Sequence, residues 1–216
     1  MNSKLVIFDL DGTLLDTLDD LSAAVNFAMQ QRGFPQHTRE EYRMMVGRGA
    51  RNLMTQALPK EHRDDETIID SVLADFRAYY NTHIDVFTKP FPGIPQLLEE
   101  LHRKGIKLAV ASNKFQEGTE HLIKEFFPEI PFVAILGNRP NHPLKPDPEV
   151  VGEVLRKAGL NTKEAVMVGD SDTDMQTAAN GGIPGIAVGW GYRNMEGIQG
   201  LTVAHSTEEL QRILLP

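Results

Sequence analysis

The stretch LVIFDLDGT at residues 5–13 places four consecutive apolar residues directly before a pair of aspartates. A short apolar run of this kind is typical of a strand that is buried on both faces, as in a parallel sheet. Asp9 and Asp11 should point the same way, because side chains alternate along a strand. An Asp-Gly turn closing a strand is the ordinary alternative. Paired carboxylates at a buried strand end are costly without a cation, so the segment favours chemistry over a simple turn.

Four further apolar runs have the same form, and Ser112 and Asp170 stand at or near the ends of two of them. The runs span residues 106–111, 132–136, 165–168 and 184–188. Helical patterns are predicted over residues 93–104, 147–158 and 172–180. Alternating strands and helices predict an α/β fold with a doubly wound, Rossmann-like parallel sheet as its core. Ligands bind such sheets beyond the carboxyl ends of the strands.

Residues 16–87 break this alternation and contain no strand-like run. Apolar residues recur there at helical spacing, as in Leu18, Leu21, Val25 and Met29. We therefore expect an inserted α-helical domain over residues 16–87, with a core formed by residues 1–15 and 88–216. The segment PFPG at residues 90–93 is the expected return linker.

A second acidic cluster, GDSDTD, occupies residues 169–174. Three carboxylates at one strand-to-helix turn repel one another, and a hard divalent cation with oxygen ligands relieves that repulsion. The alternative is an aspartate-rich cap on the following helix, with Asp172 at the N-cap position. Three acidic residues within five favour the metal site.

Two further segments, each a weaker signal, contain residues that could bind phosphate. Ser112-Asn113-Lys114 follows a predicted strand, where a hydroxyl and backbone N–H groups could bind phosphate oxygens. Lys145 precedes Pro146 and lies before a predicted helix. The stiff backbone there would hold its ammonium in a fixed position. A fixed ammonium can neutralise a nucleophile and a phosphoryl oxygen together. Alone, the first would be an ordinary loop and the second a surface lysine.

Composition excludes several other classes of function. The net charge of −8 disfavours nucleic acid and anionic membranes as partners, and a site for an anionic substrate must carry its own cations. The chain has no cysteine, which rules out disulfides, thiolate zinc sites and a cysteine nucleophile. The N-terminal apolar run is too short for a signal peptide or a membrane span, so we expect a cytoplasmic protein.

In combination, these motifs resemble the haloacid dehalogenase superfamily of phosphotransferases, and the resemblance covers essentially the whole chain. Its four motifs correspond to residues 9–13, Ser112, Lys145 and residues 169–174. The helical insert looks like the cap of the first type found in this superfamily. The segments 108–114 and 189–192 are similar to those of phosphoglycolate phosphatases and their close relatives.

The resemblance implies magnesium as the cofactor and assigns the carboxylates. Asp9 would be the nucleophile and a metal ligand. Asp11 would bind Mg²⁺ through its backbone carbonyl and act as general acid and then base through its side chain. Asp170 would bind the metal directly, and Asp174 would act through a bound water or by holding Lys145.

The resemblance also implies how the phosphoryl group is bound. Ser112, Lys145 and the backbone N–H groups of Asp11 and Asn113 would hold it. Arg48, between Gly47 and Gly49, could pair with a second anionic group of the substrate such as a carboxylate. The alternative for Arg48 is a glycine-flanked surface arginine.

We therefore expect a magnesium-dependent phosphatase that hydrolyses a small phosphate monoester through a phospho-aspartate. The presence of Asp11 argues against a dehalogenase, which has no leaving-group oxygen to protonate. A sugar-phosphate mutase and a catalytically idle binding module remain alternatives. The expected partner is a small phosphorylated metabolite and the expected state a monomer or homodimer, while the sequence does not identify the physiological substrate.

Overall fold

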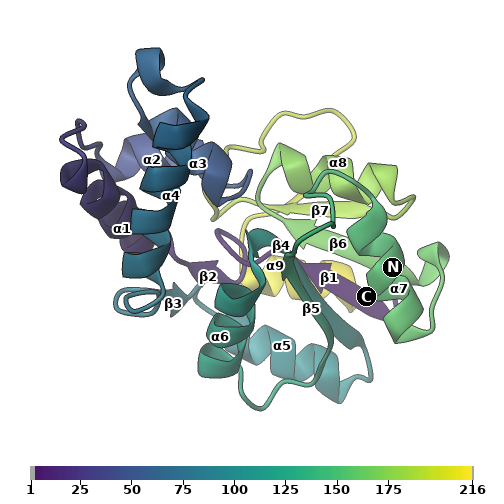
Figure 1. Ribbon diagram of the computed structural model, residues 1–216. Helices are drawn as coiled ribbons and strands as arrows, with labels where there is room; N and C mark the ends of the chain where they lie inside the picture. The colour runs from purple at the N-terminus through teal and green to yellow at the C-terminus, as the bar shows by residue number, and fades with distance from the viewer. Residues whose placement is uncertain (1–2, 216) are drawn as a thin grey trace.

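The computed structural model of the chain describes residues 3–215, and its centre is a six-stranded sheet (Figure 1). The strand order is β5-β4-β1-β6-β7-β8, and every pairing is parallel. The strands are β1 (Leu5–Phe8), β4 (Lys107–Phe115), β5 (Phe132–Asn138), β6 (Ala165–Gly169), β7 (Gly185–Val188) and β8 (Thr202–Ala204). The chain moves outward from β1 to β4 and β5 on one side, and from β6 to β7 and β8 on the other. The prediction of a doubly wound α/β fold is therefore confirmed.

Strand β1 lies where the strand order reverses, which is the usual ligand position in such sheets. All four of its residues are fully buried, as the continuous apolar run predicts. Phe8 is level with Val110 of β4 and with Val168 of β6. The polar residues that follow these positions in the three strands therefore emerge at the same edge of the sheet.

Helices cover both faces of the sheet. Val6 and Phe8 face the side that packs against α5 (Ile94–Arg103), α6 (Gln116–Phe126) and α9 (Thr207–Leu214). Leu5 and Ile7 face α7 (Glu149–Ala158) and α8 (Asp172–Asn180) on the other side. Short 3₁₀ turns lie at Lys60–His62 and Thr162–Glu164. Within residues 3–215, no helix combines the length and apolar character needed to cross a membrane.

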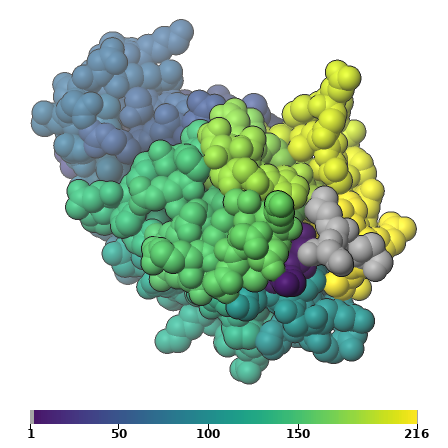
Figure 2. Space-filling model, turned by 90° about the vertical axis from the view of Figure 1, so that its right-hand side faces the viewer, coloured from purple at the N-terminus to yellow at the C-terminus, as the bar shows by residue number. Residues whose placement is uncertain are grey.

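Residues 16–87, which we call the helical insert, form a lobe beside the core (Figures 1 and 2). The helices are α1 (Leu18–Gln31), α2 (Arg39–Met45), α3 (Ala50–Ala57) and α4 (Glu66–Tyr80). The chain enters through β2 (Leu15–Asp16) and returns through β3 (Lys89–Pro90), and these two strands pair antiparallel. The buried carboxylate of Asp20 accepts hydrogen bonds from the backbone N–H groups of Phe87 and Thr88, which ties α1 to the returning chain.

Three local expectations need correction. Strand β4 does not end before Ser112 but continues to Phe115, with a register shift against β5 beyond Ala111. Asp172 is not the N-cap of α8, because Ser171 holds that position and forms a capping box with Asp174. The return linker is partly strand, since its first residue, Pro90, pairs with β2. The two- and three-residue strands β2, β3 and β8 were not predicted.

Candidate active site

The carboxyl edge of the sheet gathers the chemically active side chains that the sequence singled out. Asp9 follows β1, Ser112 lies near the end of β4, and Asp170 follows β6. Their exposed fractions are 7%, 6% and 3%, so polar groups here are screened from bulk water. Charged groups in such surroundings interact more strongly than at the surface.

Lys145 links two of the acidic residues. Its buried ammonium donates to Asp9 Oδ1 at 2.8 Å and to Asp174 Oδ1 at 2.6 Å. The side chain of Asn113 fixes the backbone of this lysine, since Asn113 Oδ1 accepts from Lys145 N at 2.8 Å. Asn113 Nδ2 donates to the Lys145 carbonyl at 3.1 Å and to the Gly47 carbonyl of the insert at 3.0 Å. Asn113 therefore positions Lys145 in addition to any role of its backbone N–H.

Asp174 is fully buried, and protein donors occupy both of its carboxylate oxygens. Oδ1 accepts from Lys145, while Oδ2 accepts from Ser171 N at 3.1 Å and from Ser171 Oγ at 2.6 Å. A side chain at Gly169 would overlap the Asp174 carboxyl group, so the close approach requires glycine. This geometry favours the expected role of Asp174 in holding Lys145.

The acidic residues fit a divalent cation. Asp9, Asp170 and Asp174 each offer a carboxylate oxygen, and these atoms lie within 4.8 Å of one another. Burial, and then the charge of Asp174, raise the pKa of Asp9 to about 7, although Lys145 opposes the shift. Burial, and then the charges of Asp174 and Asp9, raise the pKa of Asp170 well above its usual value. Magnesium, which prefers oxygen ligands, would relieve this repulsion.

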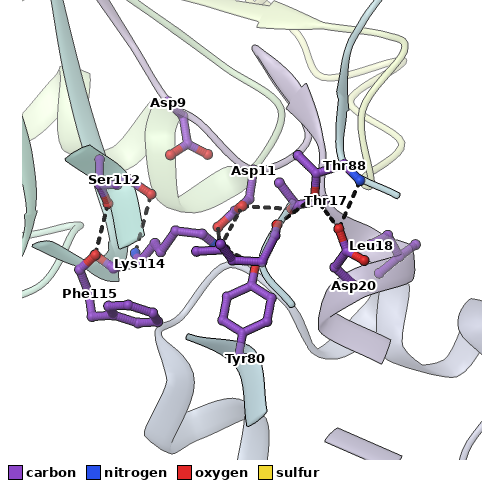
Figure 3. A network of polar contacts seen from close by, with 12 residues as sticks. Asp9, Asp11, Thr17, Leu18, Asp20, Tyr80, Thr88, Ser112, Lys114 and Phe115 are labelled. Atoms are coloured by element: carbon purple, nitrogen blue, oxygen red, sulfur yellow. Dashed lines mark hydrogen bonds and ion pairs between the residues drawn. The ribbon is translucent and has the colours of Figure 1, made fainter. Parts of the chain in front are cut away.

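The carboxylate of Asp11 is not part of this cluster and lies beside Lys114 and Thr17 (Figure 3). Thr17 Oγ1 donates to Asp11 Oδ1 at 2.6 Å. The Lys114 ammonium lies 3.0 Å from Asp11 Oδ1 and also donates to the hydroxyl of Tyr80 on α4 at 2.9 Å. Asp11 is thus separated from the metal candidates and lies beside the space between core and insert, as a group that handles a leaving-group proton would be.

A cavity lies at this junction of core and insert. Its lining atoms enclose about 470 Å³ of empty space, part of it open to solvent. The polar side is formed by Asp9, Asp11, Ser112, Asn113, Lys114 and Tyr80, and the apolar side by Leu21, Val46, Ala50, Leu53, Phe76 and Phe115. A cavity with one polar and one apolar side suits a small ligand with one charged end.

The structure does not bring Arg48 into this cavity. Its guanidinium pairs with Asp172 at 3.3 Å, and the side chain is 64% exposed. It lines a separate hollow with Asp172 and Arg193, although Gly47 and Gly49 on either side of it do line the cavity. The expectation that Arg48 contacts the substrate is not supported by this position.

Several residues of the site were missed from the sequence. Lys114 and Tyr80 are buried in the cavity wall, and neither was assigned a role. The backbone N–H of Tyr192 donates to Asp170 Oδ2 at 2.6 Å, which orients that carboxylate. Arg193 donates to the carbonyls of Met44 and Val46 in the insert at 2.8 and 2.7 Å. The available signals were the segment Ser112-Asn113-Lys114 after an apolar run, for Lys114, and the segment 189–192, for Tyr192.

The parallel sheet with a buried Asp–Lys–Asp constellation at its carboxyl edge defines a hydrolase fold of the haloacid dehalogenase type. A family model described as haloacid dehalogenase-like hydrolase matches residues 6–188, and the chain belongs to this family.

Individual relatives agree with this assignment. The chain is 34% identical to a phosphoglycolate phosphatase of Mesorhizobium japonicum over 193 residues, covering 89% of this chain and 85% of that protein. It is 34% identical to a phosphoglycolate phosphatase of Aliivibrio fischeri over 199 residues, covering 90% and 88%. A crystal structure from Lactobacillus delbrueckii subsp. bulgaricus, provisionally named a phosphoglycolate phosphatase, superposes with a TM-score of 0.92 at 34% identity and covers 99% of both chains.

Proposed function

We propose that this chain is a magnesium-dependent phosphatase that hydrolyses a small phosphate monoester, with 2-phosphoglycolate as the first candidate. The observation that carries the proposal is the ammonium of Lys145 at 2.8 Å from Asp9 Oδ1, beside a cluster of buried carboxylates. This arrangement lets a carboxylate and an anionic phosphate approach each other. The names of the relatives support the substrate class.

Asp9 is the proposed nucleophile. One of its oxygens attacks phosphorus, the ester P–O bond breaks, and Asp11 donates a proton to the departing oxygen. In the second step Asp11 takes a proton from water, the resulting hydroxide attacks phosphorus, and the phosphate leaves Asp9. The catalytic cycle thus returns Asp9 to its carboxylate form and Asp11 to the protonated form in which it begins.

The remaining residues bind and orient. Ser112, Lys145 and the backbone N–H groups of Asp11 and Asn113 hold the phosphoryl oxygens. Asp9, Asp170 and the backbone carbonyl of Asp11 would hold Mg²⁺, with Asp174 contributing through water or through Lys145. The bound ion supplies positive charge to the nucleophile and the phosphoryl group.

The test is release of inorganic phosphate from 2-phosphoglycolate by the purified protein. Asp9→Asn nearly preserves the side-chain volume but removes the nucleophile, so turnover should fall by several orders of magnitude. A variant retaining more than about a tenth of wild-type activity would contradict the mechanism, because loss of a covalent nucleophile costs far more.

Metal dependence is tested in the same assay. Activity should disappear in excess chelator and return with Mg²⁺. Calcium should restore it poorly, because it takes more ligands at longer distances and would misplace Asp9. Full activity in chelator would remove Asp170 from the proposed metal site.

The proposal also covers the partner, the location and the oligomeric state of the protein. Its partner is a small phosphorylated metabolite, its location the cytoplasm and its state a monomer or homodimer, which sedimentation can decide. Incubation with a hexose phosphate, followed by analysis for an isomer, separates hydrolysis from mutase activity.

A further inference from the structure

Lys114 places a buried cation inside the cavity. Its side chain is 3% exposed, and its ammonium lies 3.0 Å from Asp11 Oδ1, 2.9 Å from the Tyr80 hydroxyl and 4.8 Å from the centre of the Tyr80 ring. Among the cavity-lining residues, all within the described chain, Lys114 alone carries a positive charge. Within the described residues, this ammonium lies within hydrogen-bonding distance of both Asp11 oxygens, at 3.0 and 3.1 Å, and of the Tyr80 hydroxyl.

Tyr80 offers an unused hydrogen-bond donor. The side chain is fully buried, and its hydroxyl oxygen accepts the bond from Lys114. Burial, and then the charge of Asp11, raise the pKa of Tyr80 well above its usual value, so the hydroxyl keeps its hydrogen. Among residues 3–215 the structure gives that hydrogen no acceptor, and a buried donor without an acceptor is costly.

The position of these donors relative to Asp11 identifies what they face. A general acid must lie about 2.6–3.2 Å from the oxygen that it protonates. The leaving-group oxygen would therefore sit next to Asp11, and Lys114 is beside the same carboxylate (Figure 3). A charged group one or two carbon atoms beyond that oxygen would reach the Lys114 ammonium and the Tyr80 hydroxyl.

We propose that Lys114 and Tyr80 form a subsite that binds a carboxylate on the leaving alcohol of the substrate. The proposal rests on the phosphatase function proposed above and makes it more specific. The Lys114 ammonium and the Tyr80 hydroxyl hydrogen can each meet one oxygen of a carboxylate, and the apolar side chains of the cavity supply no donors for a larger anion. The subsite assigns to Lys114 and Tyr80 the anion recognition that the sequence suggested for Arg48.

The test compares 2-phosphoglycolate with ethyl phosphate, which has the same two-carbon skeleton but no carboxylate. The measured quantity is the ratio of the two kcat/KM values. Tyr80→Phe should lower this ratio about tenfold and Lys114→Gln roughly ten- to a hundredfold, as expected when a charge-assisted hydrogen bond is lost. Matched controls are Tyr79→Phe on the same helix and Lys124→Gln on the surface of α6, which should leave the ratio at its wild-type value.

Each competing role for Lys114 gives a different result. If Lys114 only orients Asp11, Lys114→Gln slows both substrates equally, the ratio stays constant, and the subsite is refuted. A fall in the ratio for Arg48→Gln, with no fall for Tyr80→Phe, would also refute it and return recognition to Arg48. If Lys114→Gln fails to fold in a thermal unfolding control, Tyr80→Phe alone decides the question.

A binding measurement separates this inference from the proposed function. In an Asp9→Asn background, calorimetry with Mg²⁺ should show that Tyr80→Phe weakens 2-phosphoglycolate about tenfold more than it weakens ethyl phosphate. If the wild-type protein hydrolyses neither ester but this difference appears, the phosphatase function fails and the subsite stands. Equal weakening of both ligands would overturn the subsite while leaving phosphatase activity intact.

Discussion

At the residue scale, the candidate site combines buried carboxylates that repel one another with a lysine that attracts two of them. Asp9, Asp170 and Asp174 share one buried corner, and Lys145 supplies an ammonium between two of them. Desolvation of a carboxylate favours its neutral form, and nearby negative charges add to that effect. The site therefore costs folding stability when no cation is bound, and removing one charge should recover part of it.

We expect Asp9→Asn to stabilise the metal-free protein at pH 8. The pKa of Asp9 rises from 3.8 to about 7 on folding, so between these values the folded state binds more protons than the unfolded state. The contribution of Asp9 to stability is thus fully present below pH 4 and is lost as pH rises through 7. At pH 8 the free energy of unfolding of the variant should exceed that of the wild type by on the order of 2–4 kcal/mol. This difference should vanish near pH 4.

Urea unfolding in chelator at several pH values measures this effect. Asp64→Asn, an exposed aspartate in the insert, is the matched control and should show no such pH dependence. An Asp9→Asn variant that is less stable than the wild type at pH 8 would mean that the ion pair with Lys145 outweighs the desolvation of Asp9.

At the scale of single elements, the N-cap residue of helix α8 contributes both to the stability of the helix and to the geometry of the site. Ser171 accepts from the backbone N–H of Asp174, and its hydroxyl donates back to the Asp174 carboxylate that receives Lys145. A side chain that caps a helix and also orients a carboxylate at the site should affect both stability and turnover. Ser206 provides the comparison, because it caps α9 and accepts from Glu209 N.

Ser171→Ala should destabilise the protein by about 1–2 kcal/mol and also lower kcat severalfold, because Asp174 loses a donor and Lys145 loses its alignment. Ser206→Ala should produce a similar stability loss without a change in kcat. Thermal unfolding and steady-state phosphate release on both variants test this. Equal effects of the two substitutions on kcat would remove Ser171 from the positioning of Asp174.

The elements also show what local sequence can reveal. The strand at 5–8 and the helix at 172–180 were predicted correctly because a continuous apolar run and a polar helix start are both short-range properties. The continuation of β4 through Ser112-Asn113-Lys114 was missed because these residues are polar and yet buried. The burial of Lys114 depends on its partners Tyr80 and Asp11. It could not be predicted locally, because these partners lie 34 and 103 positions away in the sequence. Strand β8 has only three residues, too few for a period to emerge.

At the scale of the whole molecule, the insert and the core meet over the cavity through a few polar contacts. Arg193 donates to the carbonyls of Met44 and Val46, and Asn113 donates to that of Gly47. Val46 and Gly47 thus line the cavity, and the segment that contains them is held to the core. A ligand that enters between the two parts requires these contacts to loosen and re-form.

Arg193→Gln should loosen this junction. The three carbonyls that Arg193 reaches, those of Arg43, Met44 and Val46, would lose a charged donor, and amide hydrogen exchange over residues 43–49 should accelerate. We expect KM for phosphate esters to rise about tenfold, with a smaller change in kcat, because a charge-assisted contact that favours the closed arrangement is removed. Arg156→Gln on the exposed side of α7 is the control. Unchanged exchange over residues 43–49 would show that Arg193 does not hold the junction.

The pairing of β2 with β3 has a consequence for the order in which the chain folds. Leu5 pairs with Lys107 in the central sheet, and closing so long a loop from a disordered chain costs about 4 kcal/mol of entropy. Leu15 and Pro90 lie opposite each other in this pair, so an insert that is already compact shortens the remaining loop to two brief connections. We therefore expect collapse of the four insert helices to precede the docking of β4 on β1, because local helical contacts form faster than distant parallel strand pairs. The β2–β3 pair would then hold the insert against the core segments during folding, before the central sheet is complete.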